Sequence, residues 1–143
     1  MMTNRTSVRI LVLLLGLIGP ALAFAAHWVG VGSNNGPDNK IMVDTDSLRQ
    51  LGEFTLFDIM TVYPTPLVNS HDIELDRYIQ RTAIDCVKRT FVAVKTTGYL
   101  NGKPVGTSRE LKDWRLMTIP LPNDPASNRI YDVVCKPPPP KAG

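Results

Sequence analysis

The sequence predicts an α+β fold, in which a single small antiparallel β-sheet of about five or six strands carries a C-terminal helix. Segments rich in β-branched and aromatic residues follow one another between residues 28 and 119, separated by turn-forming residues. No long helical periodicity lies between them, which excludes the alternating strands and helices of a parallel sheet. Cys86 and Cys135 fall at the ends of a predicted strand and of the last helix, so a disulfide would tie the helix to the sheet.

The N-terminal segment 1–25 is predicted to be a cleaved secretory signal peptide. Arg5 and Arg9 precede an apolar run over residues 10–15, and small residues offer cleavage after Ala23 or Ala25. The alternative is a transmembrane anchor, but this run is shorter than the roughly 20 apolar residues that a span requires. We therefore expect an exported mature protein without a transmembrane anchor, located in the periplasm, in the medium or at the cell surface.

The charge of the chain argues against a nucleic-acid partner. The sequence has 16 Lys and Arg against 13 Asp and Glu, which gives a formal charge of +3. Arg5 and Arg9 belong to the leader, so the mature chain has 16 − 2 = 14 cations against 13 anions, or +1. Such a small surplus does not indicate a basic surface. We expect a folded domain over 26–136 and a disordered proline-rich tail over 137–143.

The two cysteines allow one intramolecular pairing. In an oxidising compartment, the expected state of Cys86 and Cys135 is a disulfide. This bond would close a loop of 135 − 86 = 49 positions. The chain-entropy model assigns about 4 kcal/mol of stabilisation to a loop of that size. Two buried free thiols are the alternative.

The N-terminal part of the mature chain predicts a hairpin followed by one helical turn. Residues 28–31 and 40–44 are short apolar strands on either side of a loop rich in glycine and asparagine. A helical turn is predicted over 46–52, because Ser47 and Gln50 have capping-box spacing and glycine follows at position 52.

The central part predicts three longer strands. Residues 54–63 carry apolar side chains at both parities, which is typical of a strand buried on both faces, and Pro64 and Pro66 are expected to end it. An irregular polar loop is predicted over 67–76. Two further strands follow over 78–86 and 89–99, joined by a short turn.

The C-terminal part predicts a weak edge and then the helix. Asn101-Gly102 indicates a two-residue hairpin turn, and 103–113 is either an edge strand or a loop. The last strand is predicted over 114–119. The helix is expected to begin at Asn123 or Asp124 with a proline in its first turn. Its core-facing side chains are Ile130, Val133 and Val134.

No arrangement of residues indicates catalysis, so we expect a protein that is not an enzyme. Ser70-His71-Asp72 contains the residue types of a catalytic triad, but adjacent positions do not align as nucleophile, base and orienting group. A solvated loop is the better interpretation of this tripeptide.

No metal or cofactor is expected either. The two histidines, His27 and His71, lie far in sequence from the cysteines and from any acidic cluster with ligand spacing. Asp44-Thr45-Asp46 resembles the start of a calcium loop, but no glycine or glutamate follows at the required offsets, and a strand end is the better interpretation. No glycine-rich phosphate loop is present in the sequence.

A cluster of cations is the one candidate binding feature. Arg81, Lys88 and Arg89 lie near the turn between the strands 78–86 and 89–99. They are a candidate patch for an acidic partner, and the alternative is the solvated end of a hairpin.

A series of residues along the mature chain resembles the surface-adhesin protein E family. The residues that carry the resemblance are, in order, Trp28-Val29, the VDTDS motif at 43–47 with Leu48 and Gly52, Asp85-Cys86, Arg89, Tyr99, Trp114, Pro120 and Val134-Cys135. The resemblance extends from residue 28 to residue 135.

This resemblance implies an exported Gram-negative protein with a small antiparallel sheet and a C-terminal helix tied to it by the Cys86–Cys135 disulfide. The family's namesake binds host extracellular-matrix and serum proteins and helps attachment to epithelial cells. It is held at the outer surface as a lipoprotein, whereas no cysteine follows the apolar run here. The namesake's basic ligand-binding stretch also has no clear counterpart in this sequence.

The expected function is therefore non-enzymatic binding of a protein ligand, such as a host extracellular-matrix or serum protein. The alternative is a periplasmic accessory domain that binds a small ligand or an envelope component.

Overall fold

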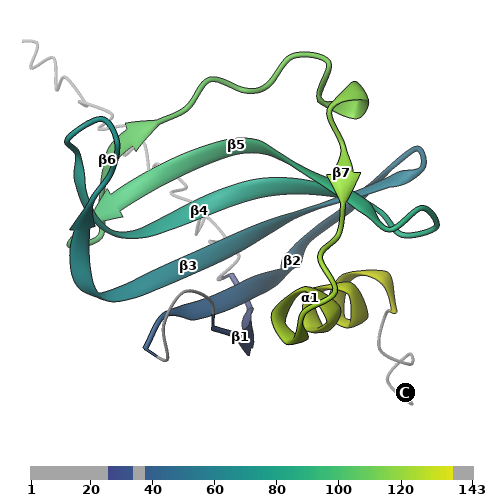
Figure 1. Cartoon of the computed structure of the whole chain (residues 1–143), viewed down its shortest axis with the longest axis horizontal. Coiled ribbons are helices and arrows are strands. Elements are labelled where there is room, and N and C mark those ends of the chain that lie inside the picture. The colour runs from purple at the N-terminus through teal and green to yellow at the C-terminus, as the bar shows by residue number, and fades with distance from the viewer. Residues whose placement is uncertain (1–25, 34–37, 137–143) are drawn as a thin grey trace, which may run out of the picture.

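The structure is a computed structural model that describes residues 26–33 and 38–136 (Figure 1). The predicted signal peptide over 1–25 and the predicted tail over 137–143 lie outside the described residues. The elements, in chain order, are β1 (Trp28–Gly32), β2 (Lys40–Leu51), β3 (Phe54–Val68), β4 (Glu74–Asp85), β5 (Thr90–Leu100), β6 (Lys103–Thr107), the 3-10 turn η1 (Trp114–Leu116), β7 (Ile119–Pro120) and α1 (Pro125–Cys135). This confirms the predicted α+β fold with an antiparallel sheet and a C-terminal helix.

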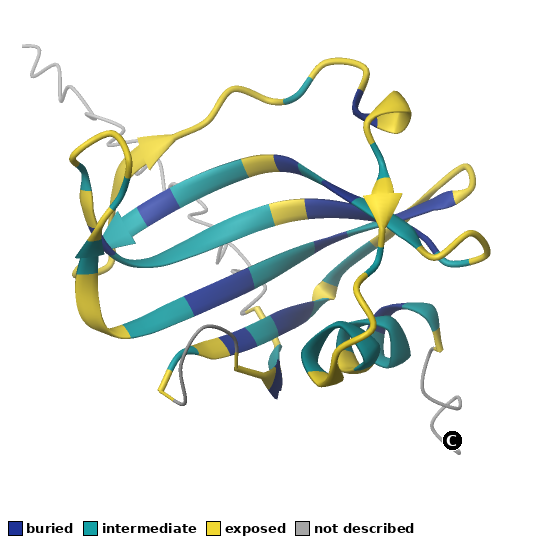
Figure 2. Ribbon diagram, in the orientation of Figure 1, coloured by how far each residue is buried: buried dark blue, intermediate teal, exposed yellow. Residues whose placement is uncertain are grey.

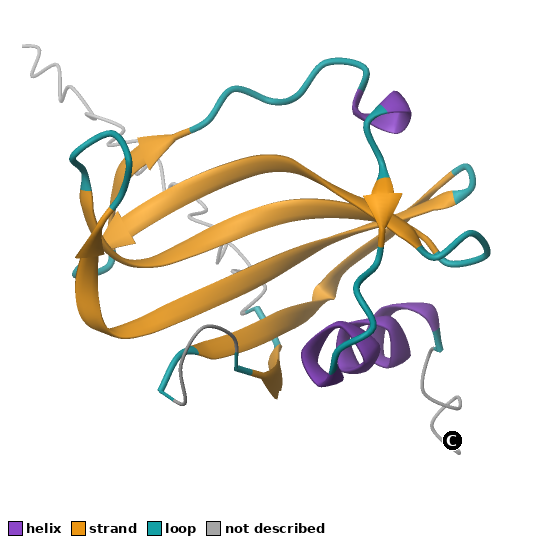
Figure 3. Cartoon of the chain, viewed as in Figure 1, coloured by secondary structure: helices purple, strands orange, loops and turns teal. Residues whose placement is uncertain are grey.

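The sheet is an antiparallel meander. Strands β1 to β6 lie in sequence order, and the two-residue strand β7 pairs with the start of β5 (Figure 3). Asn101 and Gly102 both have positive φ, 51° and 78°, as a two-residue hairpin turn requires. An edge strand and a loop are the two alternatives for 103–113, and each is correct for part of it. The segment begins as the edge strand β6 and continues as a loop.

Both faces of the central strands are buried, as the two apolar parities of residues 54–63 predict (Figure 2). On one face, the buried core beneath α1 consists of Val31, Ile41, Val43, Phe57, Ile84 and Val134. On the other face, a smaller core consists of Phe54, Ala83, Val92, Val94 and Trp114. Strand β3 contributes to both cores because alternate side chains of a strand point to opposite faces.

Helix α1 begins and packs as its sequence predicts. Asp124 is the N-cap residue, and its carboxylate accepts a hydrogen bond from the backbone N–H of Ser127 at 2.8 Å. Val134 is buried in the core, and Ile130 and Val133 pack against the same cluster. The predicted face of the helix is therefore confirmed.

The disulfide joins the last residue of α1 to the residue that follows β4. Cys86 and Cys135 are bonded, with their Cα atoms 5.6 Å apart, so the predicted pairing is confirmed. The hydroxyl of Tyr131 also donates a hydrogen bond to the backbone carbonyl of Cys86 at 2.9 Å. The end of β4 is thus held to the helix by one covalent bond and one hydrogen bond.

The helical turn predicted over 46–52 is wrong, because residues 46–51 belong to β2. Asp44 pairs with Asp58 and Arg49 pairs with Leu56, so residues 45–48 bulge out of the ladder. The hydroxyl of Ser47 donates to the carbonyl of Asp44 and accepts from the N–H of Asp58, both at 2.7 Å. The side chain interpreted as a helix cap therefore bridges two strands.

The predicted end of the strand at Pro64 and Pro66 is also wrong. Strand β3 continues through both prolines, and its register with β4 shifts between Val62 and Leu67. The prolines lie in this irregular stretch, where a missing N–H does not remove a ladder hydrogen bond.

The irregular loop predicted over 67–76 is consequently too long. Leu67 pairs with Leu75, and only residues 69–73 connect the two strands. The side-chain carbonyl of Asn69 accepts hydrogen bonds from two backbone N–H groups of this short β3–β4 loop, at 2.9 and 3.0 Å.

The strand predicted over 114–119 is largely a 3-10 turn. Trp114 is buried, and its ring packs edge-on against Phe54 with the centroids 5.0 Å apart. Asp113 enters this turn with a left-handed φ of 53°, which is incompatible with a continuous strand. Only Ile119 and the proline after it pair with β5.

Candidate functional site

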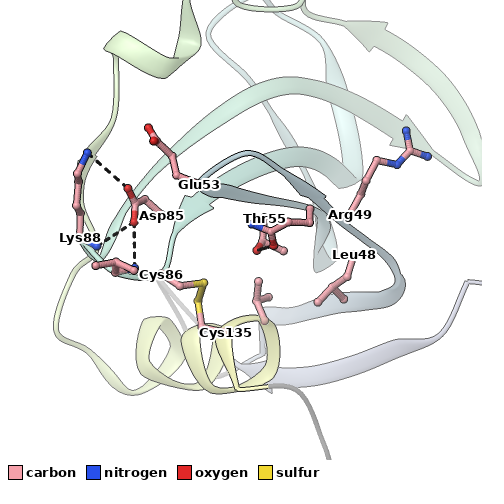
Figure 4. Close-up of a pocket in the computed structure, with 11 residues that line it drawn as sticks. Leu48, Arg49, Glu53, Thr55, Asp85, Cys86, Lys88 and Cys135 are labelled. Atoms are coloured by element: carbon pink, nitrogen blue, oxygen red, sulfur yellow. Dashed lines mark hydrogen bonds and ion pairs between the residues drawn. A yellow bond between two sulfur atoms is a disulfide. The ribbon is translucent and has the colours of Figure 1, made fainter.

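One hollow on the described surface lies beside the disulfide and has a volume of about 710 Å³ (Figure 4). Glu53, Asp85 and Lys88 lie on one side of it, and Arg49 lies on the other. Asp85 is buried, and its carboxylate accepts the backbone N–H groups of Val87 and Lys88 at 3.0 and 2.9 Å. This carboxylate therefore shapes the β4–β5 turn instead of facing a ligand.

The structure does not bring the three predicted cations together. Arg81 lies on the face opposite α1, where its guanidinium donates to both oxygens of Asp58 at 2.6 and 3.2 Å. The hydrogen bond to Asp58 is the main cause that raises the pKa of Arg81 above its usual value. Arg81 is therefore occupied by a cross-strand ion pair.

Lys88 and Arg89 lie in the β4–β5 turn with different surroundings. The guanidinium of Arg89 lies over the ring of Tyr131 at 4.0 Å and donates to the side chain of Asn128 at 3.3 Å. The side chain of Lys88 is 69% exposed, and its ammonium lies 3.8 Å from the carboxylate of Asp85. Lys88 is the cation of the three that is most available to a partner, and a binding role for this cluster stays a prediction.

The tripeptide Ser70-His71-Asp72 lies in the exposed β3–β4 loop. The hydroxyl of Ser70 is 3.3 Å from Nδ1 of His71. Asp72 has a left-handed φ of 57°, and in the described structure its carboxylate makes no hydrogen bond to the imidazole. The third member of a triad is therefore not in place. No group of three His, Cys, Asp or Glu in the described part of the chain is arranged to hold a metal ion.

A second hollow, of about 660 Å³, lies at the end of the strands away from the disulfide. Its floor includes Gln80, which pairs with Ile59, a residue packed against the core beneath α1. The hollow is therefore on the same face of the sheet as the helix. The β3–β4 loop and β6, which lie together at the left of Figure 1, form its walls. We call this hollow the groove.

Two tyrosines from neighbouring strands lie in the groove. Tyr63 and Tyr78 have ring centroids 5.9 Å apart and planes tilted by 44°. Burial, followed by the neighbouring Tyr78, raises the pKa of Tyr63 to about 12. The Tyr63 hydroxyl therefore remains protonated at neutral pH and can donate a hydrogen bond.

Two glycines let the walls of the groove approach each other closely. A Cβ on Gly98 would lie 3.3 Å from a methyl group of Leu75, and one on Gly106 would lie 3.4 Å from the terminal methyl of Ile73. Leu75 at the start of β4 thus packs on the backbone of β5, and Ile73 in the β3–β4 loop packs on that of β6. This packing gives the groove its apolar side.

Comparison with known proteins places this fold in a family. The family model described as "Surface-adhesin protein E" matches residues 28–136. The chain belongs to the surface-adhesin protein E family. A search of the curated proteins and a search of the solved structures gave no match. The chain is thus an adhesin-like protein, and the disulfide, both hollows and all the described strands lie within the matched residues. No helix in the described part of this family member is long and apolar enough to cross a membrane.

The groove was not predicted from the sequence. The sequence places Tyr63 at the end of one predicted strand and Tyr78 at the start of the next, on either side of a long predicted loop. The two rings meet because β3 and β4 pair through Thr61 and Tyr78 and then continue past the prolines. The only signal in the sequence is that an aromatic residue lies on each side of the predicted loop. This signal indicates a contact between the two rings only when the ends of both strands are known.

Proposed function

We propose that the mature chain is an exported, non-enzymatic binding protein that attaches to host proteins of the extracellular matrix or serum. Membership of the surface-adhesin protein E family is the observation that carries this proposal. The Cys86–Cys135 disulfide supports export, because such bonds persist in oxidising compartments outside the cytosol. The predicted signal peptide over 1–25 and a surface or extracellular location are parts of the same proposal.

Location tests the proposal first. Intact cells that produce the tagged protein would be treated with protease, and a parallel culture would be subjected to osmotic shock. An adhesin is expected to be digested on intact cells or recovered from the medium, while a periplasmic marker protein remains protected. Protection of the chain until the outer membrane is breached would contradict adhesion.

Direct binding tests the ligand class. The disulfide-bonded protein would be passed over immobilised laminin, fibronectin and collagen. We propose that Lys88, with its exposed side chain, contributes to binding of an acidic protein surface. Lys88→Glu is expected to weaken binding about fivefold, mainly through slower association, and more so at low salt.

The matched control for this variant is Lys103→Glu, because Lys103 is exposed on β6 and lies outside the β4–β5 turn. It carries the same change of charge. Equal loss of binding in both variants would show a non-specific charge effect and would remove Lys88 from the proposed site.

A second candidate function is a periplasmic accessory domain that binds a small ligand or an envelope component. The groove favours it, because its volume of about 660 Å³ lies in the range of small-ligand sites. The location experiment separates the two functions, since this alternative requires the protein to stay inside the outer membrane.

A further inference from the structure

We propose that the groove binds a neutral saccharide. This inference goes beyond the proposed function, because it assigns a ligand class to a defined site and does not depend on attachment to a host protein. The structural argument rests on the charge, the aromatic surface and the hydrogen-bonding groups of the groove.

The charge of the groove does not favour ionic ligands. None of the residues that line it is Lys, Arg, Asp or Glu. A phosphate or carboxylate ligand would need a cation or a helix N-terminus, and a cationic ligand would need a carboxylate. The polar residues of the lining are neutral amides and hydroxyls with one imidazole, namely Asn69, His71, Gln80, Thr96, Thr107 and Ser108.

The aromatic pair provides a surface for a sugar ring. Tyr63 and Tyr78 line the groove, and their ring faces carry negative π density, whereas the C–H groups on one face of a pyranose are weakly positive. The phenol hydroxyl at the edge of each ring can reach a hydroxyl of the same sugar. Because the two rings are tilted by 44°, they do not form one flat surface for stacking a planar aromatic ligand.

Hydrogen-bonding groups on the floor remain free to bind a ligand. Within the described chain, the side-chain amide of Gln80 and the hydroxyl of Thr96 make no hydrogen bond. By contrast, the hydroxyl of Ser108 accepts the N–H of Thr96 at 2.9 Å, so that oxygen is already engaged. An amide and a hydroxyl on adjacent strands, cross-strand partners in the register, suit the vicinal hydroxyls of a sugar.

The groove also has an apolar part, which does not suit a purely polar partner. This part is formed by Ile73, Leu75 and Val105, from the β3–β4 loop, β4 and β6. A saccharide has both an apolar C–H face and a polar rim, whereas a lipid chain would leave the amide of Gln80 without a partner. The combination of both lining types therefore favours a saccharide over a lipid.

The test is a titration followed by ¹H–¹⁵N NMR on the disulfide-bonded protein. The probes are N-acetyllactosamine, which represents host glycans, chitotriose, which represents the N-acetylhexosamines of the envelope, and an anionic heparin disaccharide. A neutral probe is expected to give saturable shifts of the amides of Gln80, Thr96 and Gly98. Binding of N-acetyllactosamine alone would indicate a host source, and binding of chitotriose alone an envelope source.

The matched variants are Tyr78→Ala in the groove and Tyr99→Ala on the opposite face, where Tyr99 lines the hollow beside Arg81. Tyr78→Ala is expected to weaken binding at least tenfold, and Tyr99→Ala to leave it unchanged. Gln80→Ala, which keeps both rings, provides the same test if Tyr78→Ala does not fold.

The inference is overturned if neither neutral probe gives saturable shifts in the groove, if the anionic disaccharide binds there equally well, or if both tyrosine variants lose binding alike. Cell location and binding to matrix proteins do not enter this titration, so its failure leaves the proposed function standing.

Discussion

At the scale of single residues, two buried threonines on one face of the sheet differ in how their hydroxyls are satisfied. The hydroxyl of Thr55 donates to the side chain of Gln50 at 3.0 Å. Among the described residues, the buried hydroxyl of Thr82 has no hydrogen-bond partner. A buried polar group without a partner retains its desolvation cost.

Thr82→Val is therefore expected to stabilise the protein by about 1 kcal/mol, because valine has the same shape and no hydroxyl to desolvate. Thr55→Val is the matched control and is expected to lower the free energy of unfolding by about 1 kcal/mol, since it breaks a hydrogen bond. Urea denaturation measures both values. A destabilised Thr82→Val protein would show that this hydroxyl has a partner in solution.

Asp76 predicts a dependence of stability on pH. Its carboxylate accepts the backbone N–H of Asn101 at 2.9 Å, and this hydrogen bond is the main cause that lowers the pKa of Asp76. Because the folded pKa lies below that of the unfolded chain, the stabilisation is complete above the unfolded value, near 3.8, and is lost as pH falls through the folded pKa.

Asp76→Asn is accordingly expected to lower the melting temperature at neutral pH. The difference from the unchanged protein should shrink as the pH is lowered from 5 toward 2, because protonated Asp76 resembles asparagine in charge. Thermal melts followed by circular dichroism across this range provide the measurement. A difference that stays constant with pH would assign the effect to geometry instead of charge.

At the scale of elements, the sequence predicts most strands and the helix because their signals are local. The apolar residues of 54–63, the Asn101-Gly102 turn and the Asp124 cap each act within a few positions of their own chain. The bulge at 45–48 is different, because Ser47 bonds across to the next strand at Asp58. Without the neighbouring strand, the local sequence of this bulge predicts a helical turn.

The candidate site was predictable only in part for a similar reason. Arg81, Lys88 and Arg89 are close in sequence. In the fold, however, Arg81 lies on the sheet face opposite α1 and pairs with Asp58, whereas Arg89 packs on Tyr131 of α1. The groove depends on Gly98 and Gly106, against which Leu75 of β4 and Ile73 of the β3–β4 loop pack. Such contacts follow from tertiary packing and have no local sequence signal.

The segment between β6 and α1 is held to the sheet by one buried side chain, that of Trp114. Trp114 is 8% exposed and packs against Phe54, whereas its neighbour Leu116 is 87% exposed. Trp114→Ala is expected to lower the free energy of unfolding by about 3–5 kcal/mol, the usual cost of truncating a buried large aromatic residue. Leu116→Ala, the control from the same turn, should change it by less than about 0.5 kcal/mol. Equal effects in urea denaturation would contradict the placement of η1.

At the scale of the whole molecule, one face of the sheet carries two structures at opposite ends. Helix α1 covers the end near the β4–β5 turn (Figure 1), and the groove lies at the other end. The disulfide lies at the helix end, where Cys86 and Cys135 join β4 to the C-terminal end of α1. The covalent bond therefore supports the core beneath the helix, while the groove depends on loop packing.

Cys135→Ser tests this division of the molecule. Loss of the disulfide is expected to lower the free energy of unfolding by about 2–5 kcal/mol, because the unfolded chain regains the freedom of the loop that the bond closes over 49 positions. Cys86→Ser should cost the same, and the double variant no more than either single one, because all three remove one bond. Denaturation of oxidised and reduced protein measures the effect, and coincident transitions would contradict it.

Below the transition, the amides of Gln80 and Thr96 in the groove should keep their NMR positions, whereas those of Ile130 and Val134 in α1 should shift. Movement of the groove signals together with those of the helix would show that the two ends of this face unfold as one unit.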